Sequence, residues 1–226
     1  MTTHNLIICG ATGRMGKLIC QLAEQSAEWK ITGKVDSKNP LEEVIDSGDV
    51  IIDFSLPQAT SGHLLLAARH QIPIVIGTTG LEKKQHAEMV QVTQLIPIVY
   101  SANMSVGMNV LCKLIEVATK KLGGTFDIEI SETHHIHKKD QPSGTSKMMG
   151  LVVEKVIGKK PPIESIREGE VIGEHTIVFG SPFEHIALLH SALDRRVFAE
   201  GALTAARWIL GKSPGLYSMQ DVLGLD

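Results

Sequence analysis

The stretch Asn5-Leu-Ile-Ile-Cys-Gly10-Ala-Thr-Gly13-Arg-Met-Gly16 joins a short apolar run to three regularly spaced glycines. The apolar residues that follow recur at i, i+3, i+4 and i+7, as Met15, Leu18, Ile19 and Leu22. This spacing predicts a helix. Strand, glycine turn and helix in this order open a βαβ unit, and a turn of this kind lets the backbone approach the pyrophosphate of a dinucleotide.

Apolar runs and helical patterns continue to alternate through the first half of the chain. Further runs at residues 31–35, 50–54, 73–76 and 96–100 are separated by helical patterns around 58–70 and 81–92. Such alternation predicts a parallel sheet covered on both faces by helices. Pro57 suits the first turn of a helix. Only residues 37–49 separate the second and third strands, which predicts a short crossover with one small helix.

The second half of the chain follows a different pattern. Residues 106–122 form a long amphipathic helical pattern, and Phe126, Ile128 and Ile130 then alternate with polar residues as in a half-buried strand. Further strands are predicted near 163–172, 174–180 and 184–190, and a last helix over 198–210 that stops at Gly211. This block is predicted to be α+β.

Composition narrows the class of protein. The chain has 226 residues, a formal net charge of −3 and no long basic run, so a nucleic-acid partner is not expected. It has no long apolar stretch and no signal peptide, so a membrane span and secretion are not expected. Cys9, Cys20 and Cys112 lie in apolar elements, which predicts buried thiols in the reducing cytoplasm, with a cysteine nucleophile as the remote alternative.

Asp36 follows the second predicted strand, a little over twenty residues beyond Gly13. A carboxylate at this point can accept hydrogen bonds from both hydroxyls of the adenosine ribose. It would repel a 2′-phosphate, so NADH is modestly favoured, although Lys38 and Arg14 leave NADPH open. The alternatives are an ordinary turn aspartate and glycines that serve only tight packing.

Two further loops follow predicted strands at the carboxyl edge of the sheet, where open α/β sheets bind their ligands. They are Gly77-Thr78-Thr79-Gly80 and Ser101-Ala102-Asn103-Met104, and ordinary turn chemistry is the alternative for both. The predicted dinucleotide-binding residues are Gly10, Ala11, Thr12, Gly13, Arg14, Met15, Asp36, Gly77, Thr78, Thr79, Ser101, Ala102, Asn103 and Met104.

Residues 132–145 read Glu-Thr-His-His-Ile-His-Lys-Lys-Asp-Gln-Pro-Ser-Gly-Thr and concentrate imidazole and ammonium groups before a predicted helix. Free backbone N–H groups at a helix start favour a carboxylate, so this block indicates a site for an anionic substrate. A metal site is the alternative, but no further ligand spacing completes a tetrahedral set. The Lys138-Lys139 pair could also be merely solvated, and Glu132 either orients an imidazole or is buried against a lysine.

Taken in order, these motifs and Gly173-Glu-His-Thr176 closely resemble the 4-hydroxy-tetrahydrodipicolinate reductase (dihydrodipicolinate reductase) family over nearly the whole chain. The most specific element is His134-His135-x-x-Lys138-x-Asp140-x-Pro142-Ser143-Gly144-Thr145. The resemblance implies reduction of a cyclic imine dicarboxylate by NADH or NADPH, with loss of water, in the diaminopimelate route to lysine. It also implies an α/β fold with a Rossmann-type domain of residues 1–105 and 197–226, a mixed-sheet domain of residues 106–196 for substrate and oligomer contacts, and a homotetramer.

The resemblance also implies roles for single residues. His134 matches the general acid/base and Lys138 the proton donor, while His135, Gly144 and Thr145 match substrate-binding positions. An imidazole, with an ordinary pKa of ~6.5, suits proton transfer near neutral pH. Arg195 and Phe198 match positions near the cofactor, and Ser37 stands where many members have arginine, which puts NADPH preference in doubt.

Two rival classes of protein fit these motifs less well. A short-chain dehydrogenase needs Tyr-x-x-x-Lys, but Met104 follows Tyr100 and Asp221 follows Tyr217 at that spacing. A regulator that only senses a dinucleotide would not need the His/Lys block.

Overall fold

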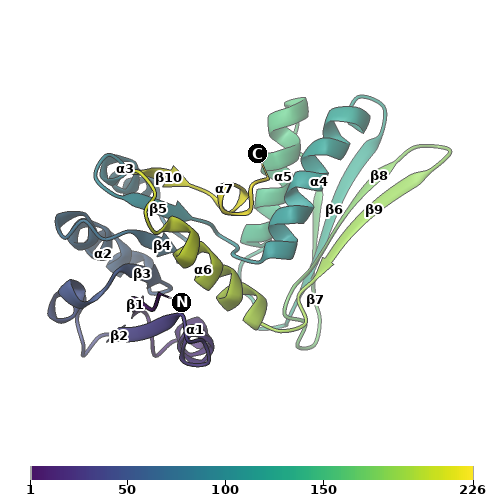
Figure 1. The fold of residues 1–226 in the computed structure, drawn as a ribbon. Coiled ribbons are helices and arrows are strands. Elements are labelled where there is room, and N and C mark those ends of the chain that lie inside the picture. The colour runs from purple at the N-terminus through teal and green to yellow at the C-terminus, as the bar shows by residue number, and fades with distance from the viewer. Residues whose placement is uncertain (1, 226) are drawn as a thin grey trace. The chain divides into compact units, whose positions relative to one another are not determined.

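The computed structural model describes residues 2–225, which form two compact units. The first unit holds the described residues up to Ser105 and those from Arg196 onward, and the second is Val106–Arg195. Each unit contains a sheet with helices packed against it (Figure 1). None of the helices within the described residues is long and apolar enough to cross a membrane.

Six parallel strands form the sheet of the first unit, in the order β10-β5-β4-β3-β1-β2. The strands are β1 (His4–Cys9), β2 (Trp29–Val35), β3 (Val50–Asp53), β4 (Ile74–Ile76), β5 (Pro97–Tyr100) and β10 (Gly215–Tyr217). The central strands β1, β3 and β4 are buried on both faces, and this explains why the sequence of each contains a continuous apolar run. The predicted α/β fold class is confirmed.

Helices cover both faces of this sheet. The helices are α1 (Arg14–Glu24), α2 (Pro57–Arg69), α3 (Lys83–Val92), α6 (Arg196–Ile209) and α7 (Met219–Leu223). Leu6 and Ile8 of β1 belong to a core with α1, α6 and α7, whereas Ile7 and Cys9 belong to a core with α2 and α3. Successive side chains of β1 therefore pack alternately into two hydrophobic cores, one on each face of the sheet.

The ends of two helices follow the predicted signals. Pro57 is the first residue of α2, where its missing N–H group costs no hydrogen bond. Gly211 follows α6 with a φ of +75°, a conformation that favours glycine.

The crossover between β2 and β3 differs from the prediction of one small helix. It contains two short 3₁₀ turns, η1 (Leu41–Glu43) and η2 (Ile45–Ser47), which bury Leu41 and Ile45 against the sheet. A 3₁₀ turn rises further per residue than an α-helix, so two of them span this distance with few residues.

The second unit is a mixed four-stranded sheet in the order β7-β6-β8-β9, packed against two helices. Its elements are α4 (Val106–Leu122), β6 (Asp127–His134), α5 (Gly144–Ile157), β7 (Ile163–Arg167), β8 (Glu174–Gly180) and β9 (His185–Ser191). Strand β6 pairs parallel with β7 and antiparallel with β8. The strand predicted near 163–172 is shorter than expected, because the chain turns after Arg167.

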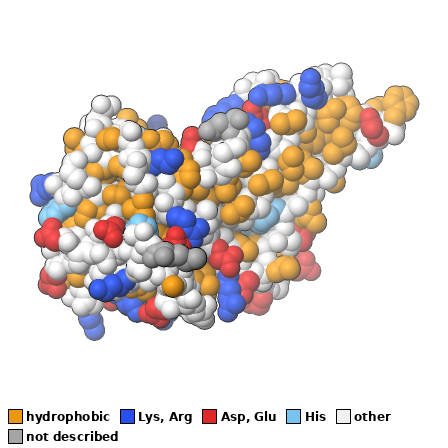
Figure 2. Space-filling view, in the orientation of Figure 1, with side chains coloured by type: hydrophobic (Ala, Val, Ile, Leu, Met, Phe, Trp, Pro, Cys, Tyr) orange, Lys and Arg blue, Asp and Glu red, His pale blue; other side chains and the backbone are white. Residues whose placement is uncertain are grey.

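The sheet of the second unit carries apolar side chains that none of the described residues buries. Phe183, Ile186 and Leu189 in and beside β9 are exposed, and so is Ile166 of β7. Figure 2 shows hydrophobic side chains gathered at the surface of this unit.

Two C-terminal elements were not predicted from the sequence pattern. Strand β10 has three residues and pairs with β5 at the edge of the first sheet, and α7 has five residues and is capped by Ser218. Both are too short to show a periodic pattern.

Candidate active site and dinucleotide cavity

The glycine turn between β1 and α1 leaves no space for side chains at two of its three glycines. Gly10 has a φ of +79°, and a Cβ there would lie 2.3 Å from the carbonyl oxygen of Phe54. A Cβ on Gly16 would lie 2.1 Å from the carbonyl oxygen of Gly10. Gly13 is exposed at the N-cap of α1, and its Cβ would meet only that same oxygen, at 3.2 Å. Tight packing therefore explains why glycine stands at positions 10 and 16. Gly13 instead leaves the N-terminus of α1 accessible from the solvent.

A cavity of about 720 Å³ lies at the carboxyl edge of the first sheet. The predicted dinucleotide-binding residues on its wall are Gly10, Thr12, Gly13, Arg14, Met15, Asp36, Gly77, Thr78 and Thr79. They come from the turns after β1, β2 and β4, so the fold brings together loops that are far apart in sequence.

The other predicted dinucleotide-binding residues are not on this wall. Ala11 is buried, and its amide donates a hydrogen bond to the carbonyl oxygen of Val35. The loop after β5, residues 101–104, is also absent from the wall, and Met104 is buried in the core under α6. A Cβ on Gly201 of α6 would lie 1.8 Å from the carbonyl oxygen of Met104, which shows how closely helix and loop pack.

Asp36 lines the cavity and also caps its own turn. Its Oδ1 atom accepts hydrogen bonds from the amides of Lys38 and Asn39 and from the Asn39 side chain, at 2.9, 3.1 and 3.0 Å. The Lys38 amide and these other donors lower the pKa of Asp36, so its carboxylate stays charged. The turn role and a ligand-binding role use different oxygens and are therefore compatible.

Sequence reasoning missed a buried polar group beneath this cavity. Asp53 ends β3 and is fully buried, and its carboxylate accepts hydrogen bonds from the Ser55 amide (2.8 Å), the Thr78 hydroxyl (3.1 Å) and Nδ1 of His63 (3.1 Å). Burial alone would raise the pKa of Asp53, but His63 and Ser55 hold it below its ordinary value. The only sequence signal was one carboxylate at the end of an apolar run.

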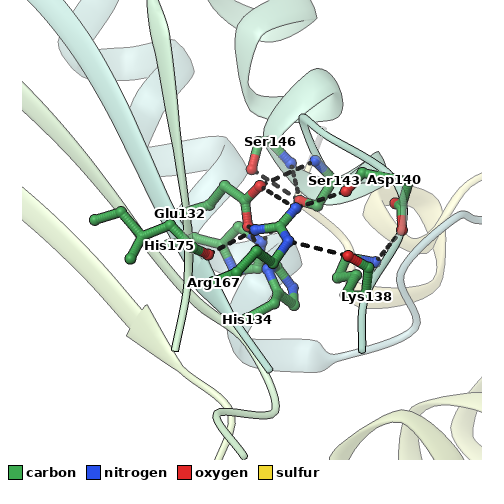
Figure 3. A network of polar contacts seen from close by, with 9 residues as sticks. Glu132, His134, Lys138, Asp140, Ser143, Ser146, Arg167 and His175 are labelled. Carbon is green, nitrogen blue, oxygen red and sulfur yellow. Dashed lines mark hydrogen bonds and ion pairs between the residues drawn. The ribbon is translucent and has the colours of Figure 1, made fainter. Parts of the chain in front are cut away.

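A cluster of polar side chains in the second unit surrounds His134, the last residue of β6 (Figure 3). The His134 ring is buried, and its Nδ1 atom donates to the carboxylate of Glu132 on the same face of the strand. Arg167, opposite on β7, forms an ion pair with Glu132 at 3.0 Å. Glu132 is therefore buried against an arginine and also orients an imidazole.

The charge state of His134 results from opposing influences. Burial lowers the pKa of His134 below its ordinary value, while Glu132 raises it and Lys138 lowers it. A second ring, His175 of β8, packs edge-on against His134 with 5.0 Å between ring centroids. Burial and the neighbouring His134 lower the pKa of His175 to about 3. His175 is therefore neutral at ordinary pH, and sequence reasoning gave it no role.

Lys138 and His135 lie on the loop that follows β6. Nζ of Lys138 lies 2.8 Å from Oδ1 of Asp140, and this ammonium holds the pKa of Asp140 below its ordinary value against the effect of burial. His135 is partly buried, and desolvation, followed by the charge of Arg195, lowers its pKa.

The start of α5 lies beside this cluster. The Ser143 hydroxyl caps the helix by accepting a hydrogen bond from the Ser146 amide at 3.1 Å, and it lies 3.2 Å from Nε2 of His175. Gly144 is exposed, with open space where a side chain would be, and Thr145 is partly buried. The helix predicted at the end of the 132–145 block is confirmed by α5, and its start leaves the backbone of the first turn approachable.

Other chemistries find less support in the geometry. Among residues 2–225, no group of three or more His, Cys, Asp or Glu side chains is placed to hold a metal ion. His137 is exposed, with Glu170 at 3.6 Å. All three cysteines are free and buried, and burial raises the pKa of each thiol, that of Cys112 to about 12. A thiolate nucleophile is not favoured at any of them.

These features define the class of protein. A doubly covered parallel sheet with a glycine turn and a cavity at its carboxyl edge, in one chain with a unit that holds a buried Glu132–His134–Arg167 cluster, is the construction of a pyridine-nucleotide-dependent oxidoreductase. Family models for "Dihydrodipicolinate reductase, N-terminus" and "Dihydrodipicolinate reductase, C-terminus" match residues 4–104 and 107–223. The chain belongs to the dihydrodipicolinate reductase family, as the motifs predicted.

Relatives with full-length matches agree with this assignment. Proteins named 4-hydroxy-tetrahydrodipicolinate reductase from Acinetobacter baumannii (strain AYE) and Caldanaerobacter subterraneus are each 39% identical to this chain. The matches cover 97% of this chain and 96% of the first relative, and 96% and 97% for the second. A dipicolinate-bound dihydrodipicolinate reductase from Paenisporosarcina sp. TG-14 has the same fold, with a TM-score of 0.81 at 20% identity over 97% of this chain and 99% of that one.

Proposed function

We propose that this protein reduces 4-hydroxy-tetrahydrodipicolinate to tetrahydrodipicolinate, with loss of water, in the diaminopimelate route to lysine. The observation that carries the proposal is the buried Glu132–His134 pair, next to the Lys138 loop and the capped start of α5. The names of the relatives support the substrate, which is a small cyclic dicarboxylate.

The residues of the second unit supply proton transfer and substrate binding in this proposal. His134 is the general acid/base, because its Nδ1 atom is engaged by Glu132 and its Nε2 atom remains for exchange with the substrate. Lys138 donates a proton and places positive charge where negative charge develops. His135, Gly144 and Thr145 bind the substrate, with one carboxylate held by the first-turn amides of α5 and the Thr145 hydroxyl.

The cavity of the first unit is the proposed dinucleotide site. When bound, a reduced nicotinamide dinucleotide supplies the hydride. The chain fits such a group, because a Cβ on Gly13 would fill part of the approach to the N-terminus of α1, where a pyrophosphate would rest. The turns of residues 10–15 and 77–79 hold it, and the proposal extends to residues 101–104, which lie off the cavity wall after the neighbouring strand β5.

The same cavity supports a modest preference for NADH. The carboxylate of Asp36 on the cavity wall suits free ribose hydroxyls and repels a 2′-phosphate. Arg14 is on the wall as well, and Lys38 is exposed two residues beyond Asp36 in the same turn, so both offset part of this repulsion.

The test is an assay in which the imine is generated in situ by the preceding synthase and nicotinamide oxidation is followed with each cofactor. Oxidation that depends on the synthase and its substrates, with kcat/KM somewhat higher for NADH, supports the proposal. Dinucleotide binding without oxidation would instead indicate a sensor, and a strong preference for NADPH would remove the proposed role of Asp36.

We also propose that copies of the chain associate, as a homotetramer, through the exposed sheet face of the second unit. Leu189 of β9 and Ile166 of β7 are exposed on the same face of this sheet, the face away from α4 and α5, as expected for a face that another copy covers. Light scattering on Leu189→Asp tests this, since a tetramer held by this face should dissociate and a monomeric wild-type protein would contradict it.

A further inference from the structure

Arg167, at the end of β7, uses all five N–H donors of its guanidinium group. Nη1 and Nη2 each lie 3.0 Å from a different carboxylate oxygen of Glu132. The remaining donors reach the carbonyl oxygens of Lys138 (3.3 Å), Asp140 (2.6 Å) and Ile166 (2.6 Å). The side chain is only 11% exposed, so these partners replace almost all of its contact with water.

These contacts connect the two residues proposed to move protons. Glu132, held by Arg167, accepts the Nδ1 proton of His134. The carbonyl oxygens of Lys138 and Asp140 belong to the loop that carries the Lys138 ammonium (Figure 3). One guanidinium group therefore holds the carboxylate behind His134 and the backbone that carries Lys138.

We propose that Arg167 is the positioning residue of this site: it clamps Glu132 so that His134 carries its proton on Nδ1, and it fixes the loop of Lys138. The inference rests on the proposed function, because it assigns Nε2 of His134 to proton exchange with the substrate. Gly173 keeps space at that nitrogen, since a Cβ there would lie 3.0 Å from it.

The geometry requires arginine rather than a positive charge alone. A carboxylate is gripped at both oxygens by two parallel N–H groups, and three further donors point to fixed carbonyls. A lysine has one nitrogen with three donors and cannot reach partners on both sides. Arg167→Lys therefore keeps the positive charge and removes the paired N–H groups that hold both oxygens of Glu132.

Four titratable or charged groups face the His134 ring. Glu132 lies on its own strand, Arg167 on β7, His175 on β8 and Lys138 on the following loop. Glu132 raises the pKa of His134, whereas burial, Lys138 and Arg167 lower it. His175 is neutral at ordinary pH and acts on the ring through packing.

Nitrogen NMR on the full chain tests the inference without relying on turnover, because the ¹⁵N shifts of a neutral imidazole show which nitrogen holds the proton. The His134 signals are assigned by their loss in His134→Gln. In the wild type we expect the Nδ1–H tautomer, and in Arg167→Lys a mixture of both tautomers. An Nε2–H tautomer in the wild type overturns the inference, and this result does not depend on whether Arg167→Lys folds.

Arg207→Lys is the matched control. Arg207 also grips a carboxylate, that of Glu28, through two nitrogens, but it lies on α6 in the first unit. We expect this variant to leave the His134 tautomer and the turnover number unchanged.

The kinetic part of the test separates this inference from the proposed function. With the imine as substrate, Arg167→Lys should lower kcat about 10²-fold, since misplacement of a reacting group by about 1 Å has effects of this size, and should leave dinucleotide affinity unchanged. If the wild type does not reduce the imine, the proposed function fails whatever the tautomer is. If the wild type does reduce it and Arg167→Lys retains both normal kcat and the wild-type tautomer, only the role of Arg167 is overturned.

Discussion

At the scale of single residues, Thr145 offers the clearest separation of binding from chemistry. It lies in the first turn of α5, one residue after the exposed Gly144. Thr145→Val removes a hydroxyl donor to a carboxylate that is present in both ground and transition states, so it should raise KM more than it lowers kcat. Steady-state kinetics with varied imine checks this, and an unchanged KM would mean that the carboxylate binds elsewhere.

Asp36 is the residue that tests cofactor choice. Asp36→Ala should weaken NADH binding and improve the relative use of NADPH, because it removes an acceptor for the ribose hydroxyls and a charge that repels the 2′-phosphate. Lys38→Ala is the matched variant in the same turn and should weaken NADPH binding alone. Fluorescence titration with each cofactor measures both effects. If Asp36→Ala weakened the binding of NADH and NADPH equally, Asp36 would serve only to cap its turn through Lys38 and Asn39.

At the scale of elements, the turn between β1 and α1 contains glycines with two different functions. Gly16→Ala places a Cβ 2.1 Å from the carbonyl oxygen of Gly10, so strand and helix must move apart. Overpacking of this kind should destabilise the protein by about 1–3 kcal/mol. Gly13→Ala meets the same oxygen at 3.2 Å and should instead weaken dinucleotide binding with a small change in stability.

Denaturant unfolding and dinucleotide titration of these two variants together check the assignment. The prediction fails if Gly13→Ala binds the dinucleotide normally, or if Gly16→Ala unfolds at the wild-type denaturant concentration.

The same scale shows which elements a sequence can predict. The helix over 106–122 and the helix at the end of the 132–145 block followed from the periodicity of their apolar residues, which is a local signal. The 3₁₀ turns of the crossover and the short β10 and α7 have too few residues for any period and are held by tertiary contacts.

At the scale of the whole molecule, one buried histidine should govern part of the acid stability. Burial holds the pKa of His175 at about 3, whereas an unfolded histidine titrates near ~6.5, so acid favours the unfolded state. Above pH ~6.5 His175 is neutral in both states and does not affect the pH dependence of the unfolding free energy. Below that pH the unfolding free energy falls by about 1.4 kcal/mol per pH unit, until the pH reaches the pKa of the folded state.

His175→Gln should therefore flatten the dependence of the unfolding free energy on pH below ~6.5. Thermal or denaturant unfolding over this range measures it, with His70→Gln as a control, because His70 is a partly exposed histidine that caps the C-terminal end of α2 beside Asp46. An equally steep pH dependence in His175→Gln would show that other groups carry the acid response.

The candidate site illustrates the limit of sequence reasoning for the molecule as a whole. His134, Lys138, Gly144 and Thr145 stand together in one motif and were found there. Arg167 is more than thirty residues from Glu132 in sequence and becomes its partner only through the pairing of β7 with β6. Asp53 and His63 meet beneath the cavity because α2 packs beside the end of β3, and a contact between a strand and the following helix leaves no periodic pattern in the sequence.

The most direct test of the account is the behaviour of His134→Gln, measured as kcat with the imine and as the dissociation constant of the dinucleotide. A positioned acid or base contributes about 10²–10⁴-fold, so kcat should fall by that factor while dinucleotide affinity stays unchanged. Lys138→Ala should behave in the same way. Near-normal turnover in His134→Gln would contradict the account, because the Glu132–His134 pair would then have no part in the reaction.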